Sequence, residues 1–205
     1  MADNPEPLYD SSGDKVVTGT RYYLLPAFSG DGGGFYTTSP FCPGDIYQES
    51  SDSSLGQPVV FYGANYSTYD YKVGNVIYES TDLNIHFPSQ LCLLLPNAWI
   101  VGPYDSTVGA WIITASGRIG FPGGPGPIWF KFEKFRDNEY VLLFDPSVCE
   151  FCQNIPKSYV GIVSEFDRRP ALNNNSPLRL KIVKASDVLQ VQEARLNKAM
   201  IASVV

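Results

Sequence analysis

Short runs of β-branched and aromatic residues, each followed by turn residues, constrain the fold of this chain more than any other feature. Most runs are about five or six residues long, and Gly, Pro, Asn, Asp and Ser separate them. With 18 glycines and 16 prolines, the chain leaves little room for long helices. The pattern predicts an all-β fold, a barrel or sandwich of many short strands. The expected strands are residues 21–26, 58–62, 75–79, 82–87, 98–102, 110–115, 128–135, 139–144, 159–163 and 178–183.

Three of these runs resemble one another: residues 83–87 (LNIHF), 130–134 (FKFEK) and 178–182 (LRLKI). Their first residues are 47 and 48 positions apart. A repeat at this period indicates one supersecondary unit used three times, and in an all-β chain it predicts a β-trefoil. The apolar members of the runs should then be buried, namely Leu83, Ile85, Phe130, Phe132, Leu180 and Ile182.

Composition predicts a compact protein whose net negative charge disfavours binding to anionic partners. Hydrophobic residues make up 44% and aromatic residues 14% of the 205 residues, enough to build one substantial core. We expect one domain over residues 1–185 and a C-terminal extension, a tail or short helix, over residues 186–205. The 21 acidic and 15 basic residues give a net charge of −6, which disfavours nucleic acid and anionic lipid. No apolar run has the length of a membrane span.

The four cysteines favour disulfides over metal or redox chemistry. Cys149 and Cys152 form a C-x-x-C, but prolines close the segment at both ends and no helix is expected to start there. A zinc site would need a second close pair, and Cys42 and Cys92 are far apart. Four cysteines allow three pairings. Disulfides imply the secretory pathway, although residues 1–5 lack the features of a signal peptide, so the protein is either cytosolic or has lost such a peptide.

No set of residues predicts an enzyme. His86 is the only histidine, and because it alternates with apolar residues of a predicted strand, we expect it to face solvent. A Ser-His-Asp or Cys-His site would depend on that one side chain. The acidic residues are dispersed, and the glycines at 30–34 lack the Lys-Ser/Thr of a phosphate-binding loop. We therefore expect no catalytic residues, no metal and no cofactor.

Residues 8–24 contain a joint signature that identifies a family. It consists of Leu8, Asp10, Gly13, Asp14, Val16, Tyr22 and Leu24. Together with residues 79–87, 129–134 and 146–152, it resembles the plant Kunitz inhibitors of the soybean trypsin inhibitor type. The resemblance covers roughly residues 5–185 and is strongest to the miraculin-like, cocoa seed protein and potato cathepsin D inhibitor branches. It implies a β-trefoil with disulfides Cys42–Cys92 and Cys149–Cys152.

The resemblance also implies a function: inhibition of a serine protease by the loop between Gly63 and Gly74. It places the residue that enters the primary protease pocket at Lys72, with Tyr71 and Val73 beside it. Asp14 stands where the family usually has an asparagine that braces the loop, and it lacks the amide donor. The expected partner is a trypsin-like or chymotrypsin-like protease, and the inhibitor is expected to be a monomer.

The sequence is compatible with two other functions. One is a storage or ligand-binding protein that has kept the fold and lost inhibition. The other is inhibition of aspartic or cysteine proteases through another loop, around Cys149 and Cys152. The sequons at Asn65 and Asn174 are candidate glycosylation sites. The resemblance implies a plant defence protein, extracellular or vacuolar.

Overall fold

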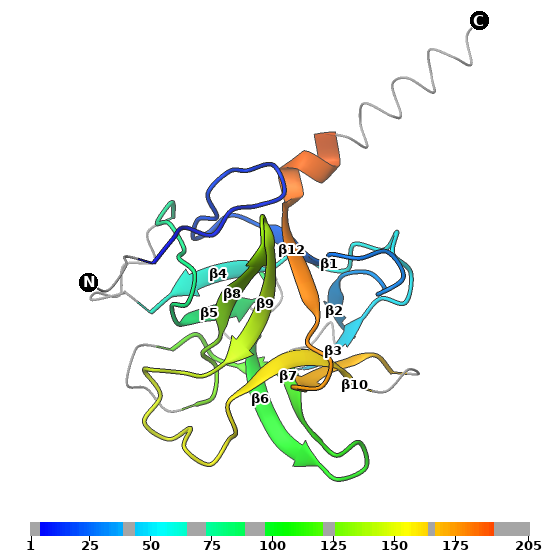
Figure 1. The fold of residues 1–205 in the computed structure, drawn as a ribbon, viewed down its shortest axis with the longest axis vertical. Coiled ribbons are helices and arrows are strands. Elements are labelled where there is room, and N and C mark those ends of the chain that lie inside the picture. Colours follow the sequence, from blue (N-terminus) through cyan, green and yellow to red (C-terminus); the bar gives the residue numbers. More distant parts are fainter. Residues whose placement is uncertain are drawn as a thin grey trace, which may run out of the picture.

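The computed structural model describes residues 5–38, 44–64, 73–88, 97–120, 126–163 and 167–190. In these residues the chain forms twelve strands, which build a barrel and a set of hairpins at one end of it (Figure 1). Their bounds are β1 Tyr22–Pro26, β2 Phe35–Thr37, β3 Gly44–Gln48, β4 Val60–Gly63, β5 Leu83–His86, β6 Ala98–Asp105, β7 Ala110–Gly117, β8 Lys131–Arg136, β9 Glu139–Phe144, β10 Ser158–Val163, β11 Arg169–Leu172 and β12 Arg179–Lys184.

Six of the strands close into an antiparallel barrel. The hairpins β4–β5 and β8–β9 pair along their lengths, and β12 joins β9 on one side and β1 on the other. Two isolated bridges complete the ring. Tyr22 and Val59 exchange backbone hydrogen bonds of 2.9 and 2.7 Å, and Leu83 and Phe130 exchange bonds of 2.8 and 2.9 Å. Closure leaves the barrel without a free strand edge.

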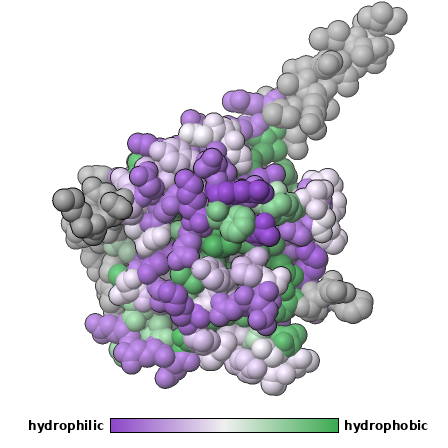
Figure 2. Space-filling view, in the orientation of Figure 1, coloured by the Kyte–Doolittle hydropathy of each residue, from purple (hydrophilic) through white to green (hydrophobic). Residues whose placement is uncertain are grey.

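The other six strands form three hairpins, β2–β3, β6–β7 and β10–β11, that cover one end of the barrel. Strand β7 pairs with both β3 and β11, which ties the hairpins together. A six-stranded barrel capped by three hairpins is a β-trefoil, so the predicted all-β fold class is confirmed. On the face drawn in Figure 2, hydrophilic residues surround small apolar patches.

The core lies inside the barrel and under its cap. Side chains of β1 alternate between buried and partly buried positions, as expected for a strand with one face toward the interior. Trp99 and Trp129 are among the largest fully buried side chains. All six residues that the repeat predicted to be buried are at most 1% exposed, which confirms that prediction.

The proposed equivalence of the three similar runs is wrong for one member. In the structure β4 pairs with β5, β8 with β9 and β12 with β1. The threefold repeat therefore relates β5 to β9 and β1, and it relates β4 to β8 and β12. The run at residue 83 lies in β5, whereas the runs at residues 130 and 178 lie in β8 and β12, so the first run is not equivalent to the other two. Apolar alternation records which face of a strand is buried, but not the strand's place in the barrel.

The strands predicted from the sequence differ from the observed ones in two further respects. Strands β2, β3 and β11 were not predicted. The segment 75–79, predicted as a strand, makes only isolated bridges among the described residues, through Val76 and Tyr78.

A short helix follows β12 at the C-terminal end, and its residues 185–190 are described (Figure 1). The rest of the predicted C-terminal extension lies outside the described residues. Within the described ranges, no helix has the length and apolar character needed to cross a membrane.

Candidate reactive loop between β4 and β5

The segment that connects β4 to β5 leaves the barrel and returns to it at adjacent positions. Gly63 is paired with Leu83 at the ends of the two strands. The backbone N–H of Ala64 donates to the carbonyl of Asp82 at 2.7 Å, which closes the base of the loop. Residues 73–82 of the returning arm are described, whereas Tyr71, Lys72 and the sequon residue Asn65 lie outside the described residues.

The returning arm is held along its length by the N-terminal segment. Backbone hydrogen bonds of 2.7 to 2.9 Å join residues 74–79 to residues 6–18. They run from Leu8 N to Ile77 O, Ile77 N to Val16 O, Thr18 N to Asn75 O, Gly74 N to Thr18 O and Glu79 N to Glu6 O. The signature in residues 8–24 therefore has a structural role: it forms the surface to which the loop returns.

Val73, which directly follows Lys72, has a fixed neighbour in this surface. Its side chain is 77% exposed, yet it lies against Gly19, where an added Cβ would stand 2.9 Å from Val73 Cγ2. Gly19 also has a φ of +80°, a conformation that favours glycine. The point at which the loop meets the N-terminal segment thus depends on the absence of a side chain at Gly19.

Asp10 organises the N-terminal turn. Its side chain is fully buried, and Oδ1 accepts hydrogen bonds from the backbone N–H of Ser12 at 2.9 Å and of Asp14 at 3.0 Å. The Asp14 carboxylate is exposed and pairs with Lys184 Nζ at 3.2 Å, and this hydrogen bond raises the pKa of Lys184. Asp14 thus ties the turn to β12. Its predicted support of the reactive loop stays a prediction.

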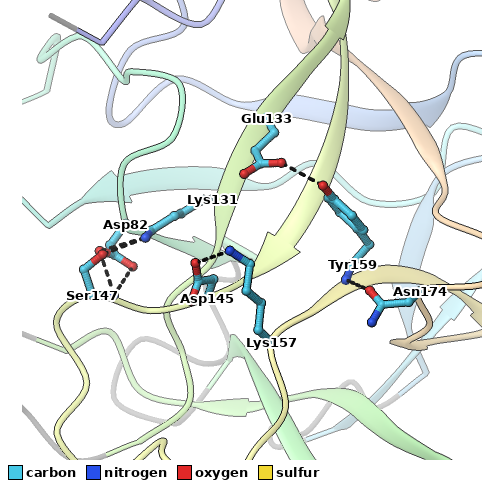
Figure 3. A network of polar contacts seen from close by, with 8 residues as sticks. All are labelled: Asp82, Lys131, Glu133, Asp145, Ser147, Lys157, Tyr159 and Asn174. Carbon is cyan, nitrogen blue, oxygen red and sulfur yellow. Dashed lines mark hydrogen bonds and ion pairs between the residues drawn. The ribbon is translucent and has the colours of Figure 1, made fainter. Parts of the chain in front are cut away.

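Asp82, a residue that the sequence did not single out, joins the loop base to a second loop (Figure 3). Its carboxylate oxygens lie 3.1 and 3.2 Å from the backbone N of Ser147, which donates to them. Lys131 Nζ lies 4.0 Å from Asp82 Oδ2 and donates to Ser147 Oγ at 2.6 Å. Burial raises the pKa of Asp82, and the charge of Lys131 opposes this effect.

The second loop, residues 145–157 between β9 and β10, is closed by the Cys149–Cys152 disulfide, which is the pairing expected for these two cysteines. Cys152 is 6% exposed and belongs to the core, whereas Phe151 is 72% exposed at the turn. An ion pair of 2.8 Å between Asp145 and Lys157 joins the ends of the loop (Figure 3). Cys42 and Cys92 lie outside the described residues.

His86 does not face solvent as the sequence predicted. It is partly buried, its Nδ1 is shielded from water, and the ring of Tyr62 lies edge-on at 6.4 Å. Burial lowers the pKa of His86 below its ordinary value of about 6.5. The prediction failed because alternation along β5 does not reveal that the Tyr62 side chain of the paired strand β4 packs against His86.

Asn174, the second glycosylation candidate, is exposed in the turn after β11, and its Oδ1 accepts a hydrogen bond from the backbone N–H of Tyr159 at 3.0 Å. Among the residues placed by the structure, no three His, Cys, Asp or Glu side chains are arranged to hold a metal ion.

Comparison with known proteins assigns the family. The Kunitz legume family model, described as "Trypsin and protease inhibitor", matches residues 8–184. The chain belongs to the plant Kunitz inhibitor family. It is therefore not an enzyme: the family consists of protease inhibitors and related proteins without catalytic activity.

Individual Kunitz relatives cover most of the chain. The 21 kDa seed protein of Theobroma cacao is 36% identical over 180 residues, which are 82% of this chain and 77% of that protein. Kunitz trypsin inhibitor 5 of Arabidopsis thaliana is 34% identical over 185 residues, 88% of this chain and 86% of that protein. The solved structure of the Kunitz-type cysteine protease inhibitor PCPI-3 from potato has a TM-score of 0.70 at 26% identity, covering 89% of this chain and 98% of that one.

Proposed function

We propose that this Kunitz protein inhibits a serine protease through the loop between Gly63 and Gly74, with Lys72 in the primary pocket of the protease. The observation that carries the proposal is the anchoring of both arms of the loop by backbone hydrogen bonds. Ala64 is bonded to Asp82 on one side, and Gly74 is bonded to Thr18 on the other. A loop whose ends are fixed loses little conformational entropy when a protease binds it.

The same anchoring explains how a substrate-like loop can inhibit. A protease binds such a loop as it binds a substrate, but the barrel holds both ends in place, so the product ends do not separate after cleavage. Lys72 is the only basic residue between Gly63 and Gly74. Its ammonium group suits a trypsin-like pocket with an acid at its base. The similarity to Arabidopsis Kunitz trypsin inhibitor 5 supports this class of target.

Titration of trypsin and chymotrypsin with the purified protein tests the proposal. Removing the side chain that fills the primary pocket costs about 2 kcal/mol or more, which is about a thirtyfold loss of affinity for Lys72→Ala. Lys72→Leu should shift preference toward chymotrypsin. Lys134→Ala, at an exposed lysine on β8, is the matched control and should inhibit like the wild type. Trypsin that stays fully active at micromolar wild-type protein would refute the proposal.

A second candidate function uses the loop at residues 145–157 against a cysteine or aspartic protease. Phe151 is exposed on a turn that the disulfide closes, and the Asp145–Lys157 pair holds the loop ends. The Cα atoms of the two cysteines are 5.6 Å apart, whereas an extended chain would separate them by about 10 Å. This turn would therefore bind as a compact aromatic projection, not as an extended substrate.

The two candidates respond to different variants. Phe151→Ala should weaken inhibition of papain or of a cathepsin D-like protease and leave trypsin inhibition unchanged. Lys72→Ala should do the reverse. The similarity to the potato cysteine protease inhibitor supports including papain in the panel. If no protease in the panel is inhibited, storage becomes the better proposal, and the cacao relative, named as a seed protein, is consistent with it.

The proposed location is the secretory pathway, outside the cell or in the vacuole. The Cys149–Cys152 disulfide supports it, because such bonds persist in oxidising compartments. Mass mapping of a non-reduced digest of the natural protein should recover this bond and a second one between Cys42 and Cys92. Free thiols at all four positions would contradict the proposed location.

A further inference from the structure

A surface hollow of about 390 Å³ lies between two of the cap hairpins, and none of its lining residues belongs to the described parts of residues 63–82. Its walls come from the β6–β7 turn with the start of β7, from both ends of β10, and from the turn after β11. The volume lies within the range of about 300 to 1,000 Å³ found for small-molecule sites. The loop proposed to inhibit a serine protease contributes none of these residues.

The lining of the hollow is uncharged. It consists of aliphatic residues, Trp111, Ser158 and three consecutive asparagines, Asn173 to Asn175, in a chain of which 18% is charged. An ionic ligand would find no opposite charge in this lining to offset the loss of its hydration. The lining therefore selects for a neutral ligand.

Two of the asparagines hold their amide groups in a fixed orientation. Asn174 Oδ1 accepts from the backbone N–H of Tyr159 at 3.0 Å (Figure 3), and Asn173 Oδ1 accepts from the backbone N–H of Asn175 at 3.1 Å. Since each oxygen is already engaged, the NH₂ group of each amide points away from that bond. These groups are available to donate to a ligand with several acceptor oxygens.

The remaining surface of the hollow is apolar and aromatic. Trp111 is partly exposed on β7, and its ring forms a T-shaped pair with the ring of Tyr104, with centroids 5.8 Å apart and an interplanar angle of 69°. The negative face of an indole attracts the C–H groups of a flat ligand. Ala110, Val163 and Leu172 provide an aliphatic surface that suits a methyl group.

We propose that this hollow binds a neutral saccharide, with its C–H face on Trp111 and its oxygen atoms accepting hydrogen bonds from the amides of Asn173 and Asn174. A pyranose ring combines the two required features, since it has apolar C–H groups on its faces and hydroxyl groups around its edge. An N-acetyl group adds a methyl for the aliphatic surface. N-acetylated sugars should therefore bind more tightly than unmodified ones.

Tryptophan fluorescence provides a selective assay. The chain has three tryptophans, and Trp99 and Trp129 are 0% and 1% exposed. Quenching by acrylamide therefore reports mainly on Trp111. The probes are chitotriose, maltotriose and, as a charged control, trigalacturonate, added to protein made in a bacterial host so that Asn174 carries no glycan.

We expect chitotriose to protect Trp111 saturably at millimolar concentration, maltotriose to bind more weakly and trigalacturonate not to protect. Asn173→Ala and Asn174→Ala should each weaken chitotriose binding about threefold to tenfold, the loss expected for one neutral hydrogen bond. Asn174→Asp keeps the acceptor for Tyr159 but loses the amide donor, so it should fold normally and still bind more weakly. Asn154→Ala, at an exposed asparagine outside the lining, should bind like the wild type.

Three results would overturn the proposal. The first is the absence of any saturable protection of Trp111 by chitotriose or maltotriose. The second is equal protection by trigalacturonate, which would indicate non-specific association. The third is equal binding by Asn174→Asp and the wild type, which would show that the oriented amides take no part.

Discussion

Replacing Asp82 with asparagine tests whether one buried carboxylate holds the two loops in place. The side chains of Asp82 and Lys131 are 5% and 12% exposed. Breaking a buried ion pair costs about 3 to 5 kcal/mol when one charge is left without a partner. The loss should be smaller here, because Lys131 Nζ is 4.0 Å from the carboxylate and keeps its hydrogen bond to Ser147 Oγ. Asparagine can still accept from Ser147 N, so we expect a loss of about 2 to 3 kcal/mol.

Urea unfolding measures this loss of stability. A double-mutant cycle with Lys131→Met shows how much of the loss comes from the interaction between Asp82 and Lys131. If the pair interacts, the double variant should lose less stability than the sum of the two single variants.

Two results would refute the reasoning about Asp82. One is an unfolding free energy of Asp82→Asn within about 0.5 kcal/mol of the wild type, as for an ordinary surface substitution. The other is a double-mutant cycle in which the stability loss of the double variant equals the sum of the two single losses. A functional measurement extends the test: because the carbonyl of Asp82 also closes the loop base at Ala64, protease inhibition should weaken together with stability.

Gly19→Ala and Gly13→Ala both place an alanine at a φ near +80°, so each should cost about 1 to 2 kcal/mol of unfolding free energy. Only the alanine at position 19 would contact the returning arm of the reactive loop, so Gly19→Ala alone should weaken protease inhibition. Equal inhibition by the two variants would contradict this. Because burial lowers the pKa of His86, the unfolded state gains its proton first, and wild-type stability should fall as pH drops below about 6.5. His86→Gln should not show this fall in pH-dependent unfolding. Replacing Cys149 and Cys152 with serine should lower the free energy of unfolding by about 2 kcal/mol, measured by heat or urea, since the closed loop is short. A variant that is already unfolded in the absence of denaturant would contradict this prediction.

Local patterns in the sequence were enough to predict the fold class and much of the core. Alternation of apolar and polar residues depends only on which face of a strand is buried, and so it identified Leu83, Ile85 and their counterparts correctly. The Cys149–Cys152 bond joins residues three positions apart. The signature in residues 8–24 identified the family, because a family resemblance needs no knowledge of contacts.

Only the tertiary structure decided which distant residues meet. The barrel closes through Tyr22 with Val59 and Leu83 with Phe130, and no periodicity in either segment specifies its partner. Strand β2 is three residues long with one buried position, too short for a recognisable alternation. The role of Asp82 depends on contacts with residues 49 and 65 positions away along the chain. Such contacts form because barrel closure brings these segments together, so they become visible only once the whole chain has folded.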